Sequence, residues 1–243
     1  KLRYAVDESK GLAVLVGDIG TGKTTLARMM LDELNEDKYE SALLIVIHTQ
    51  VTSEWLLRKI AAQLGVEDPS DVKSELLSQL SKRLIDLYED DKKAVVLVDE
   101  AQMLQNKEVM EEFRGILNIE LDGHKLITFV LIGLPELDNY LALDEPLRQR
   151  VAIRYELRSL AEDNTKEYIQ YRLQIAGCNK ILFDNNALTE IHRYSNGIPR
   201  LINTICDNAL LEGFLRKKDV ITSKMIEEIA SDLKLVPRQQ SPI

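Results

Sequence analysis

Residues 17–24 have the types and spacing of a loop that binds phosphate groups. They read Gly-Asp-Ile-Gly-Thr-Gly-Lys-Thr and lie between an apolar run at 12–16 and a helical pattern that begins near Thr24. Glycines let the backbone fold tightly, so that successive N–H groups and the positive end of the next helix can point at one anion. Lys23 can then reach the β and γ phosphates, and the Thr24 hydroxyl can ligate the Mg²⁺ that bridges them.

The loop therefore predicts a site for a nucleoside triphosphate, ATP, and for its product ADP, together with Mg²⁺. The residues of this segment expected to contact the nucleotide are Gly17, Asp18, Ile19, Gly20, Thr21, Gly22, Lys23, Thr24 and Thr25. The alternative is a glycine-rich turn without a ligand, which the strand and helix patterns on either side disfavour.

Two adjacent carboxylates follow a second apolar run. Residues 94–98 are Ala-Val-Val-Leu-Val, which is typical of a buried parallel strand, and Asp99 and Glu100 come directly after it. Ligands bind at the carboxyl ends of such strands. We expect Asp99 to hold Mg²⁺ and Glu100 to act as the general base that polarises the attacking water. An Asp-Glu pair alone is a weak signal, and its weight comes from the phosphate-binding loop.

The pattern of elements around these residues predicts an α/β fold. Strand-like runs alternate with amphipathic helices, as in a parallel sheet that is covered on both faces. The five predicted strands are 12–16, 42–48, 94–98, 127–132 and 151–157. We therefore predict a five-stranded parallel sheet with flanking helices in a nucleotide-binding domain at residues 1–158.

The strand signal disappears after about residue 159. Helices are predicted at 163–176, 185–194, 199–214 and 223–233, and Pro199 suits the first turn of its helix because proline lacks the N–H that would be unpaired there. This pattern predicts a small all-helical domain at 159–235, and residues 236–243 are predicted to be a loose tail or linker.

Composition limits the functional classes. Lys and Arg total 31 against 40 Asp and Glu, which gives a net charge of −9 and disfavours a surface that coats DNA. Cys178 and Cys206 have no paired spacing and are predicted to be reduced thiols. No apolar stretch approaches the ~20 residues of a membrane span. We expect a cytoplasmic protein. The chain begins with Lys1 rather than Met, which indicates a fragment, so the alternative is the cytoplasmic domain of a larger membrane-associated protein.

Four motifs in order carry a resemblance to a known family. They are the phosphate-binding loop, Asp-Glu-Ala-Gln at 99–102, Leu-Arg-Gln-Arg-Val at 147–151 and Gly-Ile-Pro-Arg-Leu-Ile-Asn at 197–203. Together they resemble AAA+ ATPases, and most of all the ExeA/GspA-type ATPases of the general secretion pathway. The resemblance implies a helical lid after the sheet, a nucleotide bound at their junction, and activity in oligomers.

The resemblance also implies roles for three arginines. Arg150 matches the arginine finger that acts on a neighbouring subunit's nucleotide, with Arg148 as the competing choice. Arg200, beside Pro199, matches the second sensor, which reads the γ-phosphate within its own subunit. A guanidinium can stabilise charge on the transferred phosphoryl group at a geometry that lysine copies poorly. The alternative for each arginine is surface ion pairing.

One feature departs from the class. The fourth strand of AAA+ ATPases usually ends in a polar first-sensor residue that orients the attacking water. Here residues 132–134 are Ile-Gly-Leu, which offer no side-chain hydrogen bond, and Thr128 lies too early in the strand. Slow hydrolysis, or the use of another group, is expected.

The resemblance implies a homo-oligomer in the ATP state, as a ring or a filament, that acts on a protein partner in a membrane or secretion complex. The sequence leaves two alternative functions open. One is a DNA-associated regulator like the AAA+ ATPases that control transposition. The other is a nucleotide-binding scaffold with negligible turnover, which the missing first sensor favours.

Overall fold

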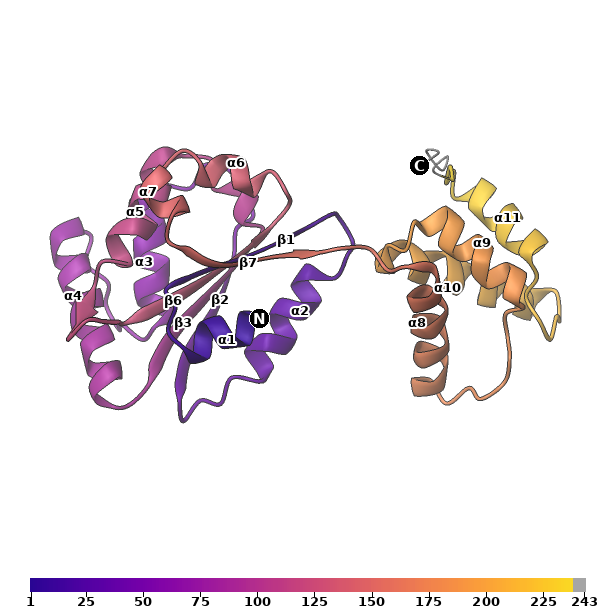
Figure 1. The fold of residues 1–243 in the computed structure, drawn as a ribbon, viewed down its shortest axis with the longest axis horizontal. Coiled ribbons are helices and arrows are strands. Elements are labelled where there is room, and N and C mark those ends of the chain that lie inside the picture. The colour runs from indigo at the N-terminus through magenta and orange to yellow at the C-terminus, as the bar shows by residue number, and fades with distance from the viewer. Residues whose placement is uncertain (238–243) are drawn as a thin grey trace. The chain divides into compact units, whose positions relative to one another are not determined.

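Five strands form one parallel sheet in the computed structural model, which describes residues 1–237 (Figure 1). The sheet order is β2-β3-β6-β1-β7. The strands are β1 (Leu12–Gly17), β2 (Tyr39–Ile45), β3 (Lys93–Asp99), β6 (Ile127–Gly133) and β7 (Val151–Leu157). The three central strands are almost completely buried, which explains their continuous apolar runs. This architecture confirms the predicted α/β fold.

Helices cover both faces of the sheet (Figure 1). One face packs against α3 (Ser53–Gln63), α4 (Lys73–Glu89) and α5 (Lys107–Ile116). The other face packs against α1 (Leu2–Asp7) and α2 (Lys23–Asp32). Because the side chains of a strand alternate between the two faces, each central strand contributes to both apolar cores. The phosphate-binding loop lies between β1 and α2.

The predicted limits of the second strand were wrong by three residues at each end. The prediction was 42–48, whereas β2 begins at Tyr39 and ends at Ile45, paired from Tyr39 opposite Lys93 to Ile45 opposite Asp99. The strand lies at the edge of the sheet, so its early positions tolerate polar residues that hide the strand pattern. Beyond its end, the side chain of Ile47 is 82% exposed and has left the core.

Several short elements have no counterpart in the sequence prediction. They are the 3₁₀ turn η1 (Ala101–Met103), the hairpin β4 (Glu120–Leu121) with β5 (His124–Lys125), and the helices α6 (Leu137–Leu141) and α7 (Glu145–Arg148). Elements of two to five residues carry too few positions for a periodic pattern. Two of them, η1 and α7, hold residues of the candidate site.

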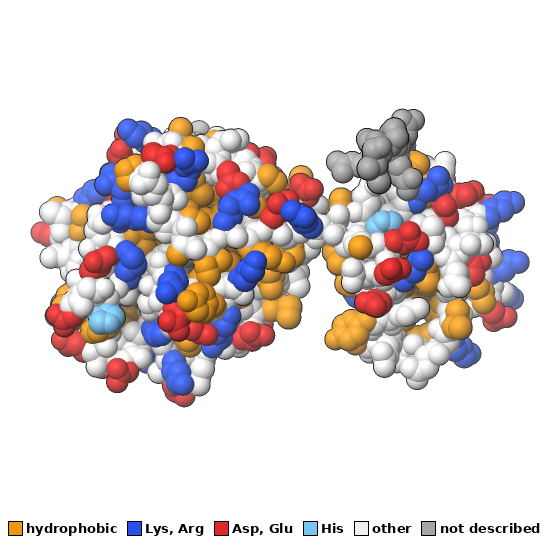
Figure 2. Space-filling view, in the orientation of Figure 1, with side chains coloured by type: hydrophobic (Ala, Val, Ile, Leu, Met, Phe, Trp, Pro, Cys, Tyr) orange, Lys and Arg blue, Asp and Glu red, His pale blue; other side chains and the backbone are white. Residues whose placement is uncertain are grey.

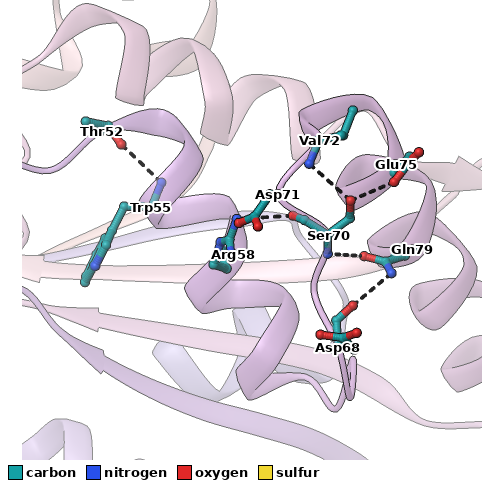
Figure 3. Close-up of polar contacts among 9 residues, drawn as sticks. All are labelled: Thr52, Trp55, Arg58, Asp68, Ser70, Asp71, Val72, Glu75 and Gln79. Atoms are coloured by element: carbon teal, nitrogen blue, oxygen red, sulfur yellow. Dashed lines mark hydrogen bonds and ion pairs between the residues drawn. The ribbon is translucent and has the colours of Figure 1, made fainter.

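A short loop ties α3 to α4 (Figure 3). The N–H of Ser70 donates to the side-chain oxygen of Gln79 on α4 (2.9 Å), and its hydroxyl donates to Glu75 (2.7 Å). On the other side, Arg58 of α3 pairs with Asp71. These contacts hold the two helices together on one face of the sheet.

The remaining helices pack into a second core of their own. They are α8 (Glu162–Ile175), α9 (Asn185–Ser195), α10 (Pro199–Leu215) and α11 (Ser223–Asp232). The chain groups into two compact units, residues 1–19 with 23–157, and residues 20–22 with those from 158 onward. We call them the sheet unit and the helical unit. The predicted tail at 236–243 lies outside the described residues, apart from Val236 and Pro237.

Phe113→Ala should destabilise the sheet unit by about 3–5 kcal/mol, because it leaves a cavity in a packed core. Phe113 and Phe129 are fully buried and meet edge to face, with their ring centroids 4.9 Å apart. Denaturant unfolding followed by the fluorescence of Trp55, the only tryptophan, measures this change. The control Ile47→Ala should change the free energy of unfolding by no more than about 0.5 kcal/mol. Equal losses in both variants would contradict the assignment of Phe113 to the core.

Candidate active site

The loop after β1 has the backbone that its glycines allow. Gly20 and Gly22 have φ angles of +83° and +103°, which other residues rarely adopt. Lys23 opens α2, and its side chain is buried. The Lys23 ammonium donates to the carbonyl oxygens of Gly17 (2.9 Å) and Asp18 (3.1 Å). The lysine is therefore held over the loop itself, where its charge can meet an anion.

The predicted metal ligands lie in contact, although 75 positions separate them in the sequence. The hydroxyl of Thr24 donates to Oδ2 of the buried Asp99 (2.7 Å). A hydroxyl and a carboxylate are hard oxygen donors, which suit Mg²⁺. Among residues 1–237, no group of three or more His, Cys, Asp or Glu side chains could hold a metal ion. In proteins Mg²⁺ is usually bound through one or two carboxylates together with substrate phosphates.

Glu100 follows Asp99 in a left-handed backbone conformation, with φ of 56° and ψ of 35°. Its N–H donates to Oδ1 of Asp99 (2.9 Å), so the two oxygens of Asp99 have different partners. A non-glycine residue with positive φ is uncommon and often marks a functional site. Asp99 is buried, whereas Glu100 remains partly exposed.

A residue without a predicted role completes this group. The Gln102 amide nitrogen donates to Oε2 of Glu100 (2.6 Å), and the Gln102 amide oxygen accepts from the N–H of Leu134 (3.1 Å). Gln102 was part of the family motif at 99–102, but its position alone assigned no function. Leu134 directly follows β6, where the sequence offers no polar side chain.

The two candidate finger arginines have different partners. Arg148, at the end of α7, makes two hydrogen bonds to Glu145 (2.7 and 2.9 Å), and the pKa of the Glu145 carboxyl is held below its usual value by this guanidinium. Arg150 lies just before β7 and donates to the carbonyl oxygen of Arg114 (3.1 Å). Of the two arginines, only Arg148 therefore pairs with a carboxylate in these contacts.

Pro199 and Arg200 open α10 in the helical unit. Residues 20–22 of the loop group with this unit, and within it the N–H of Arg200 donates to the carbonyl oxygen of Gly20 (3.2 Å). The Arg200 side chain is exposed.

The two cysteines lie outside the motifs of the candidate site. Both are free thiols in the helical unit. Burial raises the pKa of the Cys206 thiol to about 12, so it stays protonated and unreactive at neutral pH.

Comparison with known proteins gives the family. The sequence profile described as "AAA domain" matches residues 6–141, more than half of the chain. The chain belongs to the AAA domain family. The matched residues include both the phosphate-binding loop and the two adjacent carboxylates. The chain is therefore an ATPase of the AAA+ class.

The chain is also similar to a protein named for the general secretion pathway. It is 39% identical over 218 residues to general secretion pathway protein A of Aeromonas hydrophila. The alignment covers 88% of this chain but only 39% of that protein, so the chain spans well under half the length of the relative. The predicted resemblance to this type of ATPase is confirmed.

Solved structures share the fold of this AAA domain. The Aeropyrum pernix ORC2 protein in its ADP form has a TM-score of 0.68 at 16% identity, over 95% of this chain and 65% of that one. The Thermotoga maritima RuvB Holliday junction branch migration motor has a TM-score of 0.62 at 21% identity, over 96% and 67%. Among residues 1–237, none of the helices combines the length and the apolar character that crossing a membrane requires.

Proposed function

We propose that this AAA+ module hydrolyses ATP with Mg²⁺ and uses the ATP state to assemble copies of itself on a cell-envelope secretion or pilus complex. The observation that carries the hydrolytic part is the contact of Thr24 with Asp99, with Glu100 held beside them. Similarity to general secretion pathway protein A supports the secretion part.

The phosphate-binding loop and the residues Thr24, Asp99 and Glu100 each have a defined task in this proposal. The loop N–H groups and Lys23 bind the β and γ phosphates, and Thr24 and Asp99 would hold Mg²⁺, which neutralises charge on the phosphates. Glu100 accepts a proton from the water that attacks the γ phosphorus. The bond from that phosphorus to the bridging oxygen breaks, which leaves ADP and inorganic phosphate.

We assign the arginine finger to Arg150 and keep Arg148 as the alternative. The bidentate pair with Glu145 supports this choice, because Arg148 would have to leave a carboxylate before it could reach a phosphate. Arg150 gives up a contact with a neutral carbonyl oxygen instead. Arg200, just after Pro199 at the start of α10, is proposed as the second sensor, in a helical domain that follows the nucleotide-binding domain.

A DNA-associated regulator is the weaker candidate. Basic and acidic side chains are interspersed on the face of the sheet unit that Figure 2 shows, and the net charge of the chain is −9. Such a surface attracts the phosphate backbone of DNA poorly. DNA binding that weakens steeply with added salt would favour this candidate over the secretion role. The scaffold alternative predicts ATP binding without phosphate release even at high protein concentration.

Lys23→Ala should lower the affinity for ATP at least tenfold, or by about 1.4 kcal/mol or more, because the loop loses its positive charge. Titration with a fluorescent ATP analogue, with phosphate release measured in parallel, tests this prediction. The matched control is Lys82→Ala, which removes an exposed lysine from α4 and should bind ATP like the wild type. Wild-type affinity in Lys23→Ala would overturn the assignment of the site.

A further inference from the structure

We propose that Gln102 is a positioning residue that orients the Glu100 carboxylate and replaces the polar side chain that is missing at the end of β6. This inference rests on the proposed role of Glu100 as the general base. It assigns Gln102 no contact with the nucleotide, and its effect on hydrolysis passes through Glu100.

Both ends of the Gln102 amide are used, which gives the side chain one orientation. The N–H of Leu134 needs an acceptor, so the amide oxygen must face β6. The amide nitrogen then faces Glu100 and donates to its carboxylate at 2.6 Å. If the Gln102 amide were flipped, its oxygen would face the Glu100 carboxylate and its nitrogen would face the N–H of Leu134. Neither pair could form a hydrogen bond. Gln102 is only 4% exposed, so water cannot easily replace either partner.

Gly133 provides the space for this amide. A Cβ atom at Gly133 would lie 2.7 Å from the amide oxygen of Gln102 and 3.1 Å from its backbone nitrogen. The φ angle of Gly133 lies outside the left-handed region, so the backbone does not require glycine here. A larger residue at position 133 would therefore displace the Gln102 side chain.

The connection joins two strand ends. Gln102 lies on η1, directly after the Asp99-Glu100 turn that follows β3, and Leu134 follows the neighbouring β6. Since a hydrogen bond to a charged group is stronger than one between neutral groups, the amide can restrain a carboxylate whose backbone already lies in an uncommon conformation. The N–H of Leu134, just after β6, thus fixes the Gln102 amide, which in turn orients the Glu100 carboxylate. The end of β6 needs no polar side chain for this effect.

Gln102→Met, which keeps the length of the side chain and removes both hydrogen bonds, should lower kcat about tenfold or more. ATP affinity and KM should stay within about twofold, because the residue does not bind substrate. The matched control Gln105→Ala removes an exposed glutamine from the same segment and should keep the wild-type kcat. An unchanged or higher kcat in Gln102→Met would overturn the proposal.

A double mutant separates this proposal from the role of Glu100. In a Glu100→Gln background, Gln102→Met should cause no further loss, since its effect acts through the base. An additional tenfold loss there would overturn the positioning role. If Glu100→Gln alone turned over ATP like the wild type, the proposed base would be wrong, and Gln102 would have nothing to position.

Hydrogen exchange gives a measurement that does not depend on activity. The Leu134 amide should exchange faster in Gln102→Met than in the wild type. In Gln102→Glu it should stay protected, because a carboxylate still accepts from Leu134, yet kcat should fall because the donor to Glu100 is lost. Gly133→Ala should lower kcat as Gln102→Met does. Wild-type exchange at Leu134 in Gln102→Met would contradict the connection to β6.

Discussion

Glu100→Gln should lower the turnover of ATP by about 10²–10⁴-fold, because the substitution keeps the size of the side chain and removes the general base. The amide cannot accept the proton of the attacking water. Thr24, Asp99 and Lys23 are untouched, so ATP affinity in the presence of Mg²⁺ should stay close to that of the wild type. Phosphate release at saturating ATP and titration with a fluorescent analogue measure the two effects.

The variant should also accumulate whatever assembly the ATP state favours, since that state no longer decays. Size-exclusion chromatography with ATP and Mg²⁺ would detect larger species than in the wild type after turnover. Glu108→Gln is the matched control, because Glu108 is an exposed carboxylate in the first turn of α5. If Glu100→Gln retained wild-type turnover, Glu100 would not be the residue that activates water.

Arg150→Ala should abolish the rise of specific activity with protein concentration, a loss of about 10³-fold or more at concentrations where subunits associate. The reason is that an arginine finger serves a neighbouring subunit's nucleotide, so each site is complete only in the assembly. ATP affinity should remain nearly intact. Steady-state phosphate release across a wide range of protein concentrations tests this expectation, and a constant specific activity in the wild type would contradict it.

Mixing two inactive variants gives the decisive form of this test. When Arg150→Ala protein is mixed with Lys23→Ala protein, some mixed assemblies place an intact loop beside an intact finger. Activity of the mixture should therefore exceed that of either variant alone. If mixed oligomers form and remain inactive, the assignment of Arg150 is wrong. Arg148→Ala, which breaks the pair with Glu145, would then be tested in the same way.

The chemistry of the site could be predicted from short stretches of sequence because it depends on neighbouring residues. The glycines and Lys23 lie within one loop, and Asp99 and Glu100 end one apolar run. A loop that wraps a phosphate is built from consecutive N–H groups, so its signal is local. The sheet was predictable for a related reason, since strands buried on both faces must be continuously apolar. Both edge strands escape this requirement. The limits of β7 were nevertheless predicted correctly, whereas those of β2 were wrong by three residues.

Contacts between distant segments were decided by the tertiary structure alone. The order of the strands sets β3 beside β6, and only this neighbourhood brings Gln102 to the N–H of Leu134. From the sequence, the end of β6 could be described only as lacking a polar side chain. The hydrogen bond is made by a backbone group, which every residue except proline carries, and therefore leaves no mark in the sequence.

The same limit applies to the arginines. Arg148 and Arg150 have the same side chain two positions apart, so the sequence could name both and rank them only by resemblance. The i,i+3 spacing within α7 gives Arg148 the carboxylate of Glu145, whereas the packing of the chain after α7 gives Arg150 a carbonyl of α5. Residue type and local spacing determined which chemical groups this protein has available. The long-range packing of strands and helices decided which partners hold them, because hydrogen bonds form only where the fold brings donor and acceptor within about 3 Å.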